Sequence, residues 1–148
     1  MNMVEQIDSW EAGLRTEFPK MFPGGDIGVW VGPGWQPIVT ALCTSIQCYI
    51  DMAESRRLWL HDKDQLPPDY EPIEQVTVSQ IKEKFGDLRF YYAGGDEYIA
   101  GLVTMAEVWA SKTCEECGKP GTARHDRWIK TLCDEHAAER IRLREARI

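Results

Sequence analysis

The sequence predicts an α+β fold in which three helices pack on a small antiparallel sheet, followed by a zinc-ribbon or knuckle segment and a short C-terminal helix. Three observations lead to this prediction. Apolar residues recur at helical spacing in three separate stretches. One stretch of β-branched and aromatic residues is interrupted by a glycine-containing turn. Four cysteine and histidine residues near the end of the chain have the spacing of metal ligands.

The first predicted helix covers residues 3–18 and stops before Pro19. Its apolar positions follow a period of about 3.6 residues. They are Val4, Ile7, Trp10, Leu14 and Phe18. The segment "DIGVWV", residues 26–31, is flanked by proline and glycine turns and predicts a short strand.

The second predicted helix begins at Pro37 and runs to about Leu60. Its inward positions are Ile38, Leu42, Ile46, Tyr49, Ile50 and Ala53. The polar, proline-containing stretch "HDKDQLPPDYEPIE" that follows is interpreted as a loop within one domain, because the segments on either side are too short to fold independently.

The stretch "QVTVSQIKEKFGDLRFYY" predicts a hairpin that turns at "KFGD". In its second strand, Leu88, Phe90 and Tyr92 share one face, and Arg89 and Tyr91 share the other. In its first strand, apolar and basic residues occupy alternate positions, which a regular strand would place on the same face. These are Val76, Val78, Lys82 and Lys84. A β-bulge or a partly covered pocket would resolve this conflict.

The third predicted helix starts at about Asp96, whose side chain is suited to cap it. Its inward positions are Ile99, Leu102, Val103, Ala106 and Trp109.

The pattern Cys114-x2-Cys117-x15-Cys133-x2-His136 predicts a structural zinc site. Three thiolates and one imidazole complete a tetrahedral shell, which leaves no open position for catalysis. A disulfide or a loop of reduced cysteines is the alternative, and His125 is a second candidate for the fourth ligand.

The other two cysteines and the apolar residues of the zinc segment have expected structural roles. Cys43 and Cys48 are interpreted as buried apolar side chains. Trp128, Ile129 and Leu132 are expected to form the small core of the zinc segment and dock it on the rest of the chain.

We expect a core domain at residues 1–112 and a zinc-binding segment with its helix at residues 113–148. The final helix has apolar residues at roughly helical spacing and arginines largely on the outside. The apolar residues are Ala137, Ala138, Ile141 and Ile148, and the arginines are Arg140, Arg142, Arg144 and Arg147.

Charge and hydropathy limit the functional classes. The formal net charge is -7, and residues 1–111 contain 8 Lys and Arg against 17 Asp and Glu. Residues 112–148 contain 9 Lys and Arg against 7 Asp and Glu. This distribution disfavours binding to duplex nucleic acid. No apolar run is long enough to span a bilayer and no secretion signal is recognised, so we expect a cytoplasmic protein that does not bind a membrane.

Cations and aromatic residues gather around the predicted hairpin, where they would suit a planar, anionic, nucleotide-like ligand. The candidate ligand-binding residues are Trp35, Lys82, Lys84, Arg89, Tyr91 and Tyr92. The alternative is a half-exposed strand whose cations pair with Glu83 and Asp87, with Trp35 as a core anchor. No phosphate-binding loop, nucleophile elbow or zinc-protease motif is present, so we do not expect an enzyme.

Four segments, "GWQPIV", "QIKEKFGDLRFYY", "CEECGKPG" and "TLCDEH", resemble a family of small, mostly uncharacterised proteins of bacteriophages and prophages. The resemblance runs from about Gly34 to His136. It implies a counter-defence role in the host cell cytoplasm, in which a homo-oligomer sequesters a nucleotide-derived immune signal. The alternative is an interaction protein that binds a host defence protein, a phage protein or nucleic acid through its zinc segment and arginine-rich tail.

Overall fold

The computed structural model describes residues 3–24 and 27–148, and it confirms the α+β class. Its elements follow one another in this order: α1 (Met3–Glu17), β1 (Val29–Trp30), a 3-10 turn η1 (Pro33–Trp35), α2 (Gln36–Asp62), β2 (Thr77–Lys84), β3 (Asp87–Ala93), α3 (Glu97–Ala110), β4 (Thr122–His125), β5 (Ile129–Leu132) and α4 (Asp134–Glu145).

The helices α1 and α2 begin and end within about two residues of the predicted positions. Leu14 of α1 and Phe18, which directly follows this helix, are buried, whereas the side chains of Val4 and Ile7 lie outside the described residues. The six inward positions predicted for α2 are all buried or half-buried. Amphipathic spacing was therefore a sufficient guide to both helices.

The helix α3 is capped by Asp96, as predicted. Its carboxylate accepts a hydrogen bond from the Ile99 backbone N–H at 3.1 Å and another from the Tyr49 hydroxyl at 2.7 Å. The prediction that Trp109 faces inward is wrong, because 55% of this residue is exposed. The buried positions recur three to four residues apart, so Ala110 takes the place expected for Trp109.

The main sheet has the strand order β1-β2-β3 and is mixed rather than wholly antiparallel. The strands β2 and β3 form the predicted antiparallel hairpin, and β1 pairs with β2 in parallel. The predicted bulge is confirmed, because the register shifts between Val78 and Gln80. This shift lets Val78 and Ile81 both reach the buried face while Lys82 points to the other.

Two residues, Phe85 and Gly86, make the hairpin turn. Both have positive φ, 52° and 83° respectively. A two-residue turn of this kind matches the right-handed twist of the strands, but only glycine, asparagine or aspartate adopts positive φ readily. Phe85 therefore has an unfavourable backbone conformation. Its exposed fraction is 69%.

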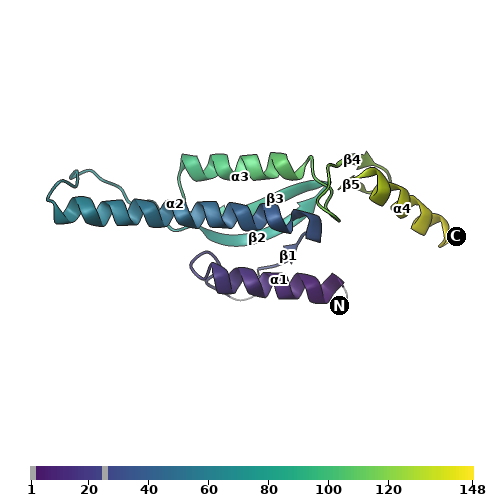
Figure 1. Cartoon of the computed structure of the whole chain (residues 1–148), viewed down its shortest axis with the longest axis horizontal. Helices are drawn as coiled ribbons and strands as arrows, with labels where there is room; N and C mark the ends of the chain where they lie inside the picture. Colours follow the sequence, from purple (N-terminus) through teal and green to yellow (C-terminus); the bar gives the residue numbers. More distant parts are fainter. Residues whose placement is uncertain (1–2, 25–26) are drawn as a thin grey trace.

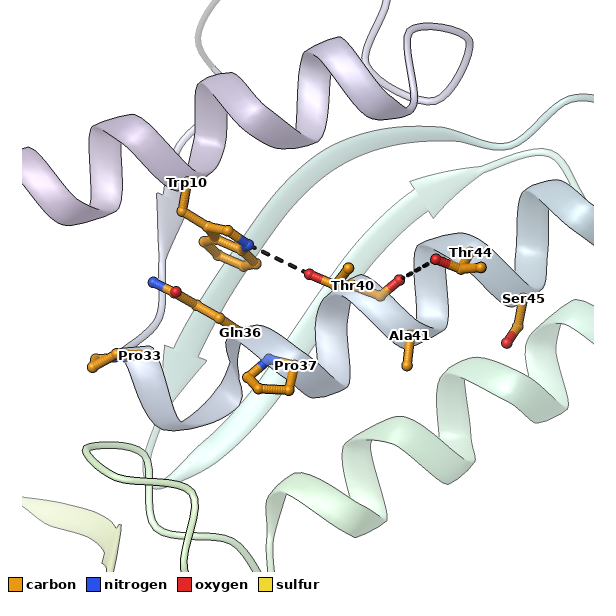
Figure 2. A pocket seen from close by; sticks show the side chains of 8 residues that line it. All are labelled: Trp10, Pro33, Gln36, Pro37, Thr40, Ala41, Thr44 and Ser45. Atoms are coloured by element: carbon orange, nitrogen blue, oxygen red, sulfur yellow. Dashed lines mark hydrogen bonds between the residues drawn. The ribbon is translucent and has the colours of Figure 1, made fainter.

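The helices α1, α2 and α3 form one layer on the sheet (Figure 1). A close view shows α2 crossing in front of the strands, with α1 on one side and α3 on the other (Figure 2). The β4–β5 hairpin and α4 lie beyond one end of this layer, and the C-terminus lies at that end. Among the described residues, no helix is long and apolar enough to cross a membrane.

Candidate metal centre and ligand-binding face

The structure brings the four predicted zinc ligands together. The ligand atoms of Cys114, Cys117, Cys133 and His136 all lie within 4.8 Å of one another. Cys114 and Cys117 come from the turn after α3, and Cys133 and His136 come from the end of β5 and the first turn of α4. Residues far apart in the chain thus converge on one point, as a metal site requires.

The distances between ligand atoms fit a tetrahedral zinc ion. Zinc–sulfur and zinc–nitrogen bonds of about 2.3 and 2.05 Å at tetrahedral angles separate two sulfurs by about 3.8 Å and a sulfur from a nitrogen by about 3.6 Å. The Cys117 and Cys133 Sγ atoms are 3.8 Å apart, and His136 Nδ1 is 3.6 Å from Cys114 Sγ and 3.2 Å from Cys133 Sγ. The cluster is therefore a structural zinc site with all four positions filled by protein.

Local backbone features prepare this site. Gly118 has a φ of 80° and its N–H donates to the Cys114 carbonyl at 2.9 Å, which closes the first knuckle. Cys133 caps α4, and its sulfur accepts a hydrogen bond from the His136 N–H at 3.5 Å. This bond favours the thiolate and, against the effect of burial, lowers the pKa of Cys133 to about 7.

Other cysteine and histidine residues stay outside the cluster. His125 lies exposed in β4 and is not part of the Cys/His cluster. Cys43 is buried as predicted, and burial, with a smaller effect of Glu17, raises its pKa to about 12. The prediction for Cys48 is wrong, because this residue is exposed. It lies on the outer side of α2, away from the positions that face the core.

The core predicted for the zinc segment is only partly correct. Leu132 is buried, Ile129 is half-buried, and Trp128 is 67% exposed in the loop between β4 and β5. No described residue of α4 is buried. Arg140 and Arg144 do not point freely outward: they fold back to hydrogen bond with the Trp128 carbonyl and the Asp126 carboxylate, both at 2.7 Å.

The loop "GPGW", residues 32–35, docks on the first zinc knuckle. The Gly32 and Gly34 N–H groups donate to the carboxylate and the carbonyl of Glu115, and the Trp35 indole N–H donates to the Thr113 carbonyl at 2.8 Å. A Cβ on Gly34 would lie 2.1 Å from the Cys114 carbonyl oxygen. Only glycine permits this approach, so the loop and the knuckle are matched surfaces.

Lys130 joins the main hairpin to the zinc segment, a contact that the sequence analysis missed. Its ammonium group lies 3.1 Å from Glu83 Oε2 and 3.2 Å from Glu115 Oε2, and both carboxylates are largely buried. Burial lowers the pKa of Lys130, but the two carboxylates outweigh it and hold the pKa above its ordinary value. Burial raises the pKa of Glu115, and Lys130 opposes this rise.

The candidate ligand-binding residues combined Trp35, which directly precedes α2, with residues of the hairpin, and this network connects those two segments. The two segments do approach one another, but Glu115 and Lys130 lie between them. Trp35 has an exposed fraction of 0%. It has no ring face left for stacking on a ligand and serves instead as the core anchor that was the alternative.

The outer face of the main sheet presents a row of cations and aromatic side chains. Trp30, Lys82 and Arg89 are register partners across β1, β2 and β3. Tyr91 is the next residue along β3 on the same face, and its ring centroid is 5.5 Å from the Lys82 ammonium. Trp30 and Tyr91 are 67% and 41% exposed, so both rings can be reached from solvent.

The other candidate ligand-binding residues occupy different positions. Lys84 lies at the turn end of this face, opposite Asp87, which is also 3.4 Å from Arg89. Tyr92 lies on the helix-facing side, where the centroid of its ring is 5.8 Å from that of Phe90. Trp30 was not among the candidates. Alternation in "GVWV" places its side chain opposite Val29 and Val31, but nothing in that segment indicates pairing next to Lys82.

A basic groove runs between the β4–β5 hairpin and α4. Its volume is about 610 Å³. Five cations line it with Glu116 and Glu139: Arg127, Lys130, Arg140, Arg144 and Arg147. The Arg140 Nη1 atom is buried and has no hydrogen-bond partner among the described residues.

Comparison with known proteins adds no relative: no protein-family model, no curated protein and no solved structure matches the chain.

Proposed function

We propose that this chain is a zinc-stabilised, non-enzymatic binding protein that holds a nucleotide-like anion on the outer face of its mixed sheet. The observation that carries the proposal is the row of Trp30, Lys82 and Arg89, with Tyr91 beside it. Exposed aromatic rings stack on nucleobases, and cations on the same face neutralise phosphate.

The charge of this face differs from that of the rest of the chain. Lys82, Lys84 and Arg89 stand against one carboxylate, Asp87, whereas the whole chain carries -7. A small anion can use this local field, but a long duplex would also meet the acidic surroundings. The ligand class is therefore a mononucleotide or a short oligonucleotide with one or a few phosphates.

Binding rather than catalysis is proposed because the chemistry of the site favours it. The zinc site has a closed Cys3His shell, which leaves no position for a reactive water. The Cys43 thiol, with a pKa of about 12, is protonated at neutral pH and is a poor nucleophile. The resemblance to small phage proteins supports a biological role, namely sequestration of a nucleotide-derived immune signal.

The first test is calorimetric titration of zinc-loaded protein with nucleoside monophosphates and cyclic dinucleotides. We expect Arg89→Ala to weaken binding about 10- to 100-fold, because it removes a charge-assisted hydrogen bond to phosphate. Trp30→Ala should weaken it by a similar factor through lost stacking. Both residues lie at the surface, so circular dichroism should show unchanged folding.

Trp128→Ala is the matched control, because Trp128 is as exposed as Trp30 but lies on the zinc hairpin. Its affinity for the ligand should equal that of the wild type. Native mass spectrometry after exposure to extract from defence-activated cells extends the test to the immune signal. The proposal would be wrong if no nucleotide bound at about 1 mM and no nucleotide-sized mass were retained.

The basic groove favours a second candidate function, binding of single-stranded nucleic acid through the zinc segment. The unpartnered Arg140 nitrogen is the specific observation, because a buried guanidinium N–H without an acceptor is costly and a phosphate would satisfy it. The groove volume also lies within the range of ligand sites.

The two candidates predict opposite responses. If the groove is the site, Arg140→Ala and Arg147→Ala should weaken binding of an oligonucleotide, and the affinity should fall steeply with salt. Arg89→Ala should then have no effect. If the sheet face is the site, the groove variants should bind mononucleotides as the wild type does.

A further inference from the structure

Two neighbouring helices present a face without charge. Residues 36–50, the first part of α2, contain no charged residue and no histidine. Residues 98–110 of α3 contain a single charged residue, Glu107. Its carboxylate points to the sheet, where it accepts a hydrogen bond from the Phe90 N–H at 3.4 Å. In a chain of which 28% is charged, two adjacent helices with such long uncharged stretches indicate a surface that another molecule covers.

On the α2 side of this face the surface is recessed, because its side chains are small. Ala41, Thr44 and Ser45 line a hollow bounded by Trp10 of α1 and by Pro37 (Figure 2). The Trp10 indole N–H is 3.4 Å from the Thr40 hydroxyl, which holds this wall in place. The hollow is open to solvent along the first half of α2 and can accept large side chains.

On the α3 side of the same face, large side chains protrude from the surface. Met105 and Trp109 are 72% and 55% exposed, and they line a second hollow together with Ala41 and Ser45. Large and small apolar residues are thus neighbours on one surface. A 180° rotation about an axis between them places the large residues of one copy over the small residues of another.

We propose that this face is the interface of a homodimer in which α3 of each copy lies in the hollow over α2 of its partner. The face is self-complementary in shape, which a two-fold interface requires. It is also the place where two chains of net charge -7 can meet without opposing charged side chains.

The exposed apolar area is adequate for a dimer. Four large side chains of the uncharged stretch of α3 contribute to it, and Met52 of α2 adds to its edge, beyond residues 36–50; the four are Tyr98, Met105, Val108 and Trp109. The exposed fractions of these side chains, Met52 included, correspond to roughly 600 Å² per copy, somewhat below the about 800 Å² per partner of a standard interface. The small residues of α2 add to this area and bring it closer to that of a standard interface.

The test is sedimentation velocity of the zinc-loaded chain between about 1 and 100 µM. We expect a dimer, and we expect Ala41→Glu and Met105→Glu each to raise its dissociation constant about tenfold or more. Both side chains are exposed, so circular dichroism of the variants should match the wild type.

Trp128→Glu is the control, because it also replaces an exposed apolar side chain with a charge but lies on the zinc hairpin. It should remain dimeric. A wild-type chain that stays monomeric throughout the range would overturn the proposal, as would a dimer that neither α-helical variant weakens. Ligand binding to the outer sheet face is measured separately, so the two proposals can fail independently.

Discussion

Lys130 is the residue that most directly couples the two parts of the chain. It is the common partner of Glu83, which precedes the hairpin turn, and of Glu115, which lies within the first zinc knuckle. Glu83 also accepts a hydrogen bond from the Gly86 N–H at 2.7 Å. Two carboxylates thus share one ammonium group, without which both would be largely buried with no counter-charge.

Replacement of Lys130 by methionine should lower the free energy of unfolding by about 2–4 kcal/mol, because it leaves two buried carboxylates unpaired. The raised pKa of Lys130 means that its contribution is complete below the ordinary lysine pKa of about 10.4 and is lost only as the pH rises through the higher value. Urea unfolding at pH 7.5 therefore measures the full effect.

Lys119→Met is the matched control for this measurement. Lys119 pairs with Glu135 at 3.6 Å, but both side chains are more than half exposed. This variant should change the free energy of unfolding by no more than about 0.5 kcal/mol. Equal effects of the two substitutions would contradict the role assigned to Lys130.

No sequence pattern identifies the Lys130 network. The sequence analysis paired Glu83 with the hairpin cations, which are its neighbours in the chain, whereas its partner is 47 residues away. By contrast, the zinc ligands were predictable, because metal coordination imposes short spacings within each pair. Long-range ion pairs have no such local signature.

At the scale of the elements, the hairpin turn combines an unfavourable backbone with an exposed aromatic side chain. Phe85 has a φ of 52°, and its neighbour Gly86 has a φ of 83°. Asparagine followed by glycine is the preferred pair for such a turn.

Phe85→Asn should therefore raise the free energy of unfolding by about 0.5–1 kcal/mol, since asparagine adopts positive φ at lower cost. The midpoint of urea unfolding is the appropriate measurement. Phe85→Ala serves as the control, because it removes the same ring but keeps a side chain that disfavours positive φ. A midpoint that is the same in both variants would show that the turn conformation does not limit stability.

The helices and the antiparallel hairpin were predictable because their signals are periodic and local. The position of β1 was not. The segment Val29–Trp30 is only two residues long, and its parallel pairing with β2 depends on how the chain between them folds back. The outer face of the main sheet, which includes Trp30, therefore could not be predicted from the sequence, although Lys82, Arg89 and Tyr91 were individually identified as candidates.

At the scale of the molecule, the zinc site supports more than the segment that contains it. Thr113 and Glu115 hold the loop at residues 32–35, which leads directly into α2. Thr131 adds a further contact, because its hydroxyl donates to the Gly86 carbonyl at 2.7 Å. Domain division at residue 112 remains a prediction from sequence, but these contacts connect both sides of that position.

Removal of zinc should consequently destabilise the helices as well as the zinc segment. We expect unfolding followed by far-ultraviolet circular dichroism, which reports all the helices and α2 most strongly, to move to lower urea concentration when a chelator is added. Above the dissociation constant, each tenfold increase in free zinc should add about 1.4 kcal/mol to the free energy of unfolding.

Cys117→Ser should reproduce the effect of the chelator, because it removes one ligand. Cys48→Ser is the control, since Cys48 is exposed and is not part of the metal cluster. If the helices unfolded at the same urea concentration with and without zinc, the zinc segment would be an independent appendage.

The docking of residues 32–35 on residues 113–115 also has a consequence for biosynthesis. A ribosome releases the chain from the N-terminus, so the loop before α2 emerges long before the backbone groups that it binds. The Trp35 indole cannot form its hydrogen bond until Thr113 has been synthesised. The first zinc knuckle cannot complete its metal site until Cys133 and His136 have been synthesised. The nascent chain thus cannot complete this contact until residues 113–136 have been translated, and the supply of zinc at that stage will influence how quickly folding is completed.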